Sequence, residues 1–186
     1  MRYEKGHKET TRRHIVDVAS RKFRENGVAA AGIAGIMSAA GLTNGAFYLH
    51  FDSKEDLVRA VLGDERERGL ESNLRGNVGL EESIRNYLAP RHRDNAGSGC
   101  PTAALVAEIA RHPVKTREVF TDKVEEVIGL IGAHLRDRSM AQRRRKAMAI
   151  YGMMVGSLQL ARAVHDRRLS DEILENAIES ALALAG

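Results

Sequence analysis

Hydrogen-bonding side chains gather in one short segment near the start of the chain, LTNGAFYLHFDSKEDL, hereafter the polar stretch. Thr43, Tyr48, His50 and Lys54 all lie within it. A hydroxyl at Thr43 is suited to capping a helix, because it can accept a hydrogen bond from a free backbone N–H group. Lys54 falls in the first turn of a following helix, where a cation opposes the helix dipole, so an anionic partner outside the protein would explain it. The alternative is a surface helix pair without a partner.

The residues before the polar stretch predict two helices that hold it. After a polar arm at residues 1–8, apolar residues follow helical spacing up to a stop signal at Gly27. A second, short helix is expected over residues 33–40, and Gly41 permits a tight turn into the polar stretch. Two short helices joined by a glycine-containing turn, after a longer support helix, are typical of a helix-turn-helix unit.

Composition predicts an all-α protein. Ala, Leu, Arg and Glu dominate the 186 residues, and runs of strand-favouring residues are missing. The net charge of +4 permits nucleic-acid binding without requiring it. A single cysteine, Cys100, excludes an intrachain disulfide framework, and the first twenty residues lack the apolar core of a signal peptide, so we expect a cytoplasmic protein. Scattered histidines and the absence of a plausible Ser/His/Asp set or a phosphate-binding glycine loop predict a non-enzyme without metal or cofactor.

A set of residues in the first helix, the turn and the polar stretch carries a family resemblance: Ile15, Ala19, Phe23, Gly27, Ile36, Ala40, Gly41, Leu42, Thr43, Gly45, Tyr48, His50, Phe51, Ser53, Lys54 and Leu57. With these residues, the segment 13–57 resembles the N-terminal DNA-binding domain of the TetR/AcrR family of bacterial transcriptional regulators. Two positions depart from the family pattern. Gly32 stands where Ser or Thr is usual, so one hydroxyl contact to phosphate is missing, and Met37 replaces a small alanine.

The resemblance implies a two-domain architecture. It predicts a three-helix helix-turn-helix domain over residues 1–57 and a larger α-helical ligand-binding and dimerisation domain over residues 58–186, with about nine helices in total. Phosphate contacts are assigned to Tyr48, His50 and Lys54, assisted by the basic N-terminal arm, and base-edge contacts to the start of the recognition helix. The full set of predicted DNA-binding residues is Thr43, Asn44, Gly45, Ala46, Tyr48, His50 and Lys54.

Helical patterns continue beyond the polar stretch. The helix that starts in it is expected to run on into the charged segment 64–68, which would join the two domains as a solvated helix face. Residues 91–99 are expected to form a loop, and Pro101 begins a buried helix. Further helices are predicted over residues 114–136 and 142–164, and a last helix is expected to be capped by Ser170.

The C-terminal helices suggest a ligand pocket and a dimer contact. We expect the pocket among the central helices, lined by Cys100, Leu105, Phe120, Tyr151 and Met154, although ordinary core packing is the alternative for each residue. Few charges interrupt these apolar runs, which favours an apolar or aromatic effector. The helix over residues 142–164 is apolar on nearly all sides, so a second subunit is expected to cover one of them. The predicted dimer residues are Gly152, Gly156, Ile173, Ala177 and Ile178.

The resemblance, together with these patterns, implies a ligand-responsive, sequence-specific regulator of transcription. It would be a homodimeric repressor that binds double-stranded operator DNA and releases it when a small-molecule effector binds. Arg162 and Gln159 in the most apolar helix argue against a membrane span. Two alternatives stay open. One is a repressor that senses oxidants or electrophiles through Cys100, since a helix start can lower a thiol pKa. The other is a helical interaction module that does not bind DNA.

Overall fold

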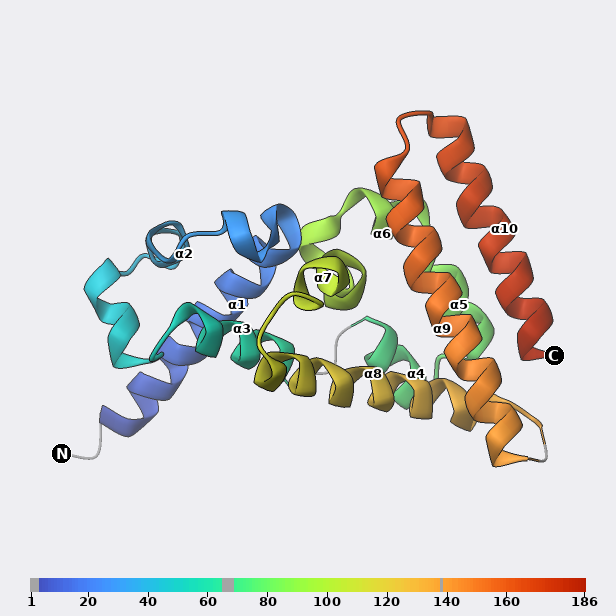
Figure 1. Cartoon of the computed structure of the whole chain (residues 1–186), viewed down its shortest axis with the longest axis horizontal. Coiled ribbons are helices and arrows are strands. Elements are labelled where there is room, and N and C mark those ends of the chain that lie inside the picture. The colour runs from blue at the N-terminus through green and yellow to red at the C-terminus, as the bar shows by residue number, and fades with distance from the viewer. Residues whose placement is uncertain (1–3, 65–68, 138) are drawn as a thin grey trace.

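The computed structural model describes residues 4–64, 69–137 and 139–186, and in these residues every regular element is helical. Figure 1 shows the chain as two groups of helices that meet at α7. The all-α prediction is confirmed, with ten α-helices and two 3-10 helices in the described residues where about nine helices were expected. The N-terminal group consists of α1 (Glu4–Ala30), α2 (Ile33–Ala39), the 3-10 helix η1 (Asn44–Leu49) and α3 (Lys54–Leu62). The C-terminal group consists of α4 (Leu70–Arg75), α5 (Leu80–Tyr87), α6 (Pro90–Asp94), η2 (Ala96–Ser98), α7 (Pro101–Ile109), α8 (Val114–His134), α9 (Met140–Ala163) and α10 (Arg167–Ala185).

The first helix begins earlier than its apolar pattern predicts. Residues 4–8 belong to α1, so the described part of the expected polar arm is helical. Thr10 and Thr11 donate side-chain hydrogen bonds to the carbonyl groups one turn earlier, and Glu9 pairs with Arg13 one turn later. Hydrogen bonds and ion pairs between polar side chains one turn apart therefore support this part of the helix without burial in a hydrophobic core. The predicted stop at Gly27 is a kink with φ of 81°.

Three further boundaries differ from the predicted ones. The helix that starts in the polar stretch ends at Leu62 and is capped by Gly63. The expected continuation of this helix into residues 64–68 is therefore wrong at residue 64, and residues 65–68 lie outside the described part. Residues 91–99 are largely helical rather than a loop, because Pro90 begins α6 and η2 follows directly.

Ser170 does not cap the last helix. Asp166 does so by accepting a hydrogen bond from the backbone N–H of Arg168 at 2.9 Å, which moves the helix start forward to Arg167. Ser170 is buried instead, where it donates to the carbonyl of Ala161 at 2.6 Å and accepts from Arg93 at 2.8 Å. The hydroxyl therefore joins α10 to α9 and α6.

Two hydrophobic clusters form the core, and α7 belongs to both. The N-terminal cluster is centred on Phe23 and Phe47 and includes Leu62, together with Leu105 and Ile109 from α7. The C-terminal cluster is built from α4, α5, α8, α9 and α10, and it includes Ala103 from the same helix α7. The predicted division of the chain after residue 57 remains a proposal, and the extent of the N-terminal cluster favours a division after residue 62. Among the described helices, none combines the length and the apolar character needed to cross a bilayer.

Candidate nucleic-acid interface and ligand cavity

Within the polar stretch, η1 forms a short 3-10 segment with an exposed outer face, hereafter the turn, and α3 begins near the end of the stretch. Thr43, Asn44 and Gly45 are exposed at the start of the turn, and Tyr48 follows with 65% of its surface accessible. Thr43 is the N-cap residue with an extended backbone, but its hydroxyl makes no capping hydrogen bond, so the predicted cap is wrong. The hydroxyl is therefore available to a partner outside the chain.

Two phenylalanines hold this turn in place from behind. Phe47 and Phe51 are buried, and their rings stack at a centroid distance of 5.6 Å within the N-terminal cluster. Because both rings point inward, the backbone between them must present Tyr48 and Leu49 to solvent. Ala46 is half-buried against the same cluster, which leaves it less accessible than its neighbours.

Cations from α1 surround the far end of the turn. The guanidinium group of Arg12 lies 4.7 Å above the ring of Phe51. His50 is half-buried, and burial together with the positive charges of Lys8 and Arg12 lowers its pKa. Lys54 begins α3, and its ammonium group lies 3.5 Å from the carbonyl oxygen of Ala29. The imidazole is therefore neutral near pH 7 and sits in a positive field that suits phosphate.

The helix starts on this surface are capped differently. Ser53 caps α3 by accepting a hydrogen bond from the N–H group of Asp56 at 3.1 Å. Gly32 caps α2 with an extended backbone and no side-chain hydrogen bond, and open space surrounds the position a Cβ would take. Met37 is fully buried in the N-terminal cluster without disturbing α2.

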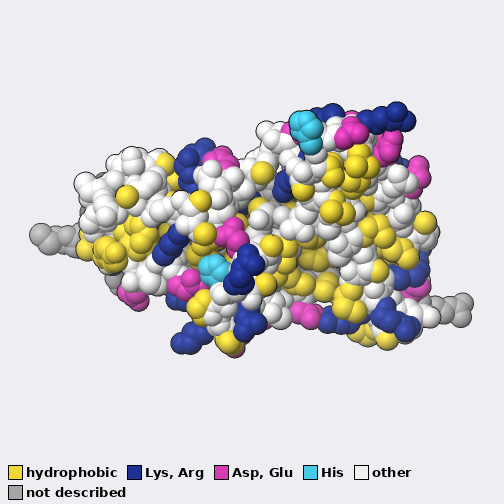
Figure 2. All heavy atoms as spheres, turned by 45° about the horizontal axis from the view of Figure 1, so that its top comes forward, with side chains coloured by type: hydrophobic (Ala, Val, Ile, Leu, Met, Phe, Trp, Pro, Cys, Tyr) yellow, Lys and Arg dark blue, Asp and Glu magenta, His cyan; other side chains and the backbone are white. Residues whose placement is uncertain are grey.

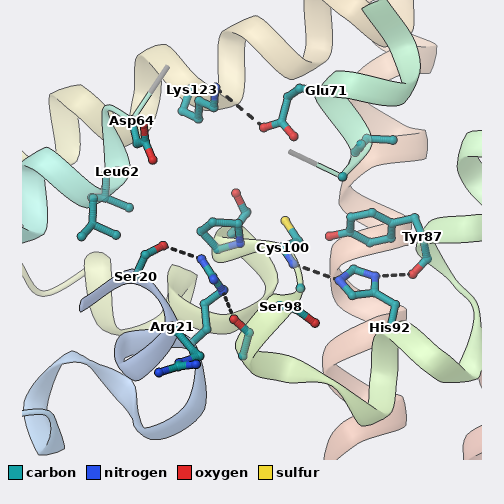
Figure 3. A pocket seen from close by; sticks show the side chains of 18 of the residues that line it. Ser20, Arg21, Leu62, Asp64, Glu71, Tyr87, His92, Ser98, Cys100 and Lys123 are labelled. Carbon is teal, nitrogen blue, oxygen red and sulfur yellow. Dashed lines mark hydrogen bonds and ion pairs between the residues drawn. The ribbon is translucent and has the colours of Figure 1, made fainter. Parts of the chain in front are cut away.

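A cavity of about 750 Å³ lies where the two groups of helices meet. Figure 3 shows side chains converging on it from α1, from the end of α3 and from the C-terminal group. The α1 wall carries Asp17, Ser20, Arg21 and Arg24. The remaining wall combines apolar residues with polar and charged ones, among them Leu62, Asp64, Leu70, Glu71, Ser83, Asn86, Tyr87, His92, Cys100, Thr102, Phe120 and Lys123. Apolar surface makes up the larger part of the exposed wall, and the polar and charged side chains lie among it.

Only two of the five predicted pocket residues reach this cavity. Cys100 and Phe120 line it. Leu105 packs into the N-terminal cluster and Met154 into the C-terminal one, while Tyr151 is buried and donates its hydroxyl proton to Thr102 at 3.0 Å. Helical periodicity marks a buried face, but it does not say whether a cavity or a packed neighbour covers that face.

A chain of hydrogen bonds fixes the wall formed by α5 and the start of α7. His92 Nδ1 lies 2.6 Å from the carbonyl oxygen of Tyr87, and His92 Nε2 lies 2.9 Å from the backbone nitrogen of Cys100. A carbonyl can only accept and an N–H group can only donate, so the proton sits on Nδ1 and the ring is neutral. Burial lowers the pKa of His92, and Arg162 and Arg91 lower it further, although the bond to Tyr87 opposes this shift.

An acidic group on α4 faces the same cavity. Burial raises the pKa of Glu71, and its carboxylate lies 3.8 Å from the ammonium group of Lys123. That ammonium group is closer to Glu126, at 2.8 Å. No sequence pattern marks Glu71 as a cavity residue, because an acidic residue near a helix start is ordinary on a surface.

The far end of α7 is fastened to the N-terminal helices. Glu108 accepts a hydrogen bond from the N–H group of Ala29 at 2.9 Å. Just beyond α7, His112 and Thr116 both contact the carboxylate of Glu55 on α3, at 2.7 Å and 2.9 Å. Although burial opposes the shift, these two hydrogen bonds lower the pKa of Glu55. Helix α7 therefore runs from the cavity wall at Cys100 into the N-terminal group of helices.

The outer face of α9 and α10 is partly apolar. Figure 2 shows hydrophobic side chains gathered over the half of the molecule where these two helices lie. Gly152 is exposed between Met148 and Leu160, which are 41% and 59% accessible. Of the other predicted dimer residues, Gly156, Ile173 and Ile178 are half-buried. Ala177 is 4% exposed and packs inside the chain's own C-terminal cluster, so its assignment to a dimer surface is wrong.

Comparison with known proteins places the chain in a family. Residues 15–61 match the model described as bacterial regulatory proteins, tetR family. The transcriptional regulator UidR of Escherichia coli K12 is 36% identical over 130 residues, which cover 68% of this chain and 65% of UidR. The chain belongs to the TetR family. The regulator AcrR of Shigella flexneri is 47% identical to this TetR-family chain over 51 residues, covering 27% of the chain and 24% of AcrR.

The matched segments span about a quarter of AcrR and about a third of TtgR, a transcriptional regulator of Pseudomonas putida. Solved structures extend the TetR-family likeness to the whole fold. Reduced NemR of E. coli superposes with a TM-score of 0.75 at 22% identity, covering 95% of this chain and 97% of NemR. A TetR regulator from Legionella pneumophila gives a TM-score of 0.76 at 21% identity, covering 93% and 96%.

Proposed function

We propose that this chain is a ligand-responsive repressor that binds operator DNA as a homodimer in the bacterial cytoplasm. The observation that carries the proposal is the cavity shared by α1 and the C-terminal helices. A ligand there touches the support helix of the DNA-reading turn directly. Only a ligand that binds one arrangement of these helices better than another can change DNA affinity. Because both groups of helices form the cavity wall, a change in their arrangement changes the contacts that a ligand makes, and therefore its affinity.

The DNA-reading role is assigned to the exposed turn. Tyr48 and Lys54 contact phosphates, and His50 adds a neutral ring in the positive field of α1. Asn44 faces adenine edges, and Thr43 and Ala46 lie beside it at the start of the recognition helix, where base edges are within reach. Gly45 allows close approach, because nothing lies within 4 Å of the position of its missing Cβ.

Helix α7 carries the response from the cavity to this turn. Its first residues form part of the cavity wall, whereas Leu105 and Ile109 are part of the N-terminal cluster. When a ligand shifts the start of α7, the hydrogen bond from Ala29 to Glu108 and the one from Thr116 to Glu55 transmit the movement to α1 and α3. Since α1 and α3 move, the spacing of two reading turns in a dimer changes, and operator affinity falls.

A salt titration of DNA binding tests the proposal. The Tyr48→Ala, Lys54→Ala double variant should bind the gene's own upstream DNA at least about tenfold more weakly, because two phosphate contacts are lost. Its affinity should also depend less steeply on salt. The control is Arg168→Ala, which removes an exposed cation at the start of α10. Wild-type affinity and salt dependence in the double variant would refute the assignment, and no binding by the wild-type protein would favour a helical interaction module.

A thiol-sensing repressor is the second candidate. Cys100 is half-buried on the cavity wall at the N-cap of α7, so a modified sulfur would push on the same helix that a ligand pushes on. Hydrogen peroxide and an unsaturated aldehyde are suitable probes of this role. If the Cys100→Ser protein still loses its DNA in response to both reagents, the cysteine is not the sensor.

A further inference from the structure

Glu71 is a carboxylate on the cavity wall whose charge the protein balances incompletely. It lies in the first turn of α4, its side chain is 17% exposed, and it lines the cavity. Figure 3 shows the carboxylate directed into the cavity. Among the described side chains, Lys123 is its only ion-pair partner, at 3.8 Å, a separation too long for a hydrogen bond.

Lys123 is engaged more closely by a second carboxylate. Its ammonium group donates a hydrogen bond to Glu126 at 2.8 Å, and Arg75 also pairs with Glu126. The hydrogen bond from Lys123 lowers the pKa of Glu126, whereas burial raises the pKa of Glu71 despite the charge of Lys123. Glu126 is not part of the cavity wall. The carboxylate with two partners therefore lies outside the cavity, and the carboxylate with one distant partner faces it.

Apolar side chains from the same two helices accompany Glu71. Leu70 precedes it on α4, Phe120 lies one turn before Lys123 on α8, and both line the cavity. A cationic group beside Glu71 would bring an apolar body attached to it against these side chains. The attraction between such a group and a largely buried carboxylate is strong, because little water screens the pair.

The arginines of the α1 wall offer less to an anionic ligand. Arg24 donates hydrogen bonds to Ser20 and to the carbonyl of Gly97. Arg21 has no ion pair or side-chain hydrogen bond within the described part of the chain, but it is exposed and lies at the edge of the cavity (Figure 3). Since solvent and salt screen an exposed guanidinium group, an anion gains little by binding there.

We propose that Glu71 anchors the effector by accepting hydrogen bonds from the protonated amine of an organic cation. An ammonium group supplies donors that the carboxylate lacks and neutralises its charge. The apolar body of the ligand would lie along Leu70 and Phe120. This proposal rests on the proposed function of the cavity as the effector site, and it names the ligand class and the recognising residue.

Three probes with one apolar body and different head groups test the charge preference: phenylbutylamine, phenylbutanol and phenylbutyrate. Calorimetry measures their binding to the wild-type protein near neutral pH, where the heads are cationic, neutral and anionic. The amine should bind about tenfold more tightly than the alcohol, because only the amine forms a charge-assisted hydrogen bond with Glu71. The acid should bind no better than the alcohol. This comparison requires no variant.

Glu71→Gln keeps the shape of the side chain and removes its charge. Amine binding should weaken about tenfold while alcohol binding stays unchanged, so the preference disappears. The matched control is Glu81→Gln, which removes an exposed carboxylate that pairs with Arg85 outside the cavity. That control and Arg21→Gln should both keep the preference. A purely structural role of Glu71 would instead lower the Tm of Glu71→Gln and leave the preference unchanged.

Three results would overturn the proposal. They are amine binding no tighter than alcohol binding, tightest binding by the acid, and an amine preference that survives in Glu71→Gln or is lost equally in Glu81→Gln. Binding of upstream DNA is measured alongside for every protein. If the wild-type protein binds the amine through Glu71 but binds no DNA, the proposed function fails while recognition by Glu71 stands. If it binds DNA and none of the probes, only the recognition proposal fails.

Discussion

Gly32 is a position of the proposed DNA-binding surface where a side-chain contact is missing. It caps α2 with φ of −71° and ψ of 149°, angles that any residue can adopt, and a Cβ there would meet nothing within 4 Å. A serine fits this position without strain. Its hydroxyl can accept a hydrogen bond from a free N–H of α2 and can also donate to a phosphate.

Gly32→Ser should therefore improve both stability and DNA binding. The expected gain in the free energy of unfolding is about 0.5–1 kcal/mol, from the cap and from reduced freedom of the unfolded chain. Urea unfolding measures the first effect and a gel-shift titration the second. Gly32→Ala is the control, because it restricts the chain without adding a hydroxyl. Equal DNA affinities of the two variants would show that the hydroxyl reaches no phosphate.

Some of the candidate site residues were predictable from the sequence and others were not. The family resemblance predicts a surface role for Asn44 and Tyr48, which are exposed, and Cys100 at its helix start lines the cavity as predicted. Ser83 was not predicted, although a hydroxyl on the apolar stripe of α5, one turn before Tyr87, was a visible anomaly. A buried polar residue on an apolar face requires a partner, and that requirement could have marked the cavity wall.

At the scale of elements, the joint between α1 and α7 depends on Gly27. This glycine has a φ of 81°, and the carboxylate of Glu108 lies against the position where a Cβ would stand. The same carboxylate accepts the hydrogen bond from Ala29 that fastens α7 to the N-terminal helices. A side chain at residue 27 would both strain the backbone and displace the Glu108 carboxylate.

Gly27→Ala should lower the free energy of unfolding by about 1–3 kcal/mol, because alanine is strained at positive φ. Chemical denaturation provides the measurement. Gly35→Ala is the matched control, since Gly35 lies inside α2 with open space around it and should gain up to about 1 kcal/mol. A Gly27→Ala protein as stable as the wild type would mean that the joint adapts without strain.

Elements themselves were predictable, and their ends were less so. The helices around residues 33–40 and 114–136 followed their periodicity closely. The start of α10 was misplaced because Asp166 and Ser170 are both acceptable caps, and only the packing of Ser170 against Ala161 decides between them. Helix α6 was not predicted for a different reason: its five residues are too few for a periodic pattern.

At the scale of the molecule, the exposed apolar face of α9 is assigned to the dimer. Within one chain nothing covers this face at Met148, Gly152 and Leu160, which are all exposed. Leu160→Glu should give a monomer in light scattering, because a carboxylate would be buried without a partner. Operator affinity should fall about tenfold or more, since two linked reading turns bind better than one.

Val114→Glu is the control for this prediction. Val114 is similarly exposed, at 58%, but it begins α8 away from the α9 face. This variant should remain dimeric and keep its DNA affinity. A Leu160→Glu protein that stays dimeric would place the subunit contact elsewhere.

The position of α7 in both hydrophobic clusters limits how the chain can be recombined. Leu105 and Ile109 complete the N-terminal cluster, although they lie more than forty residues beyond α3 in sequence. A chimaera that takes only residues 1–62 from this chain would leave that core open unless the host supplies matching side chains at both positions. Exchange of operator specificity between relatives therefore has to preserve the last two turns of α7 along with the reader, and a graft designed on the linear sequence alone would omit them.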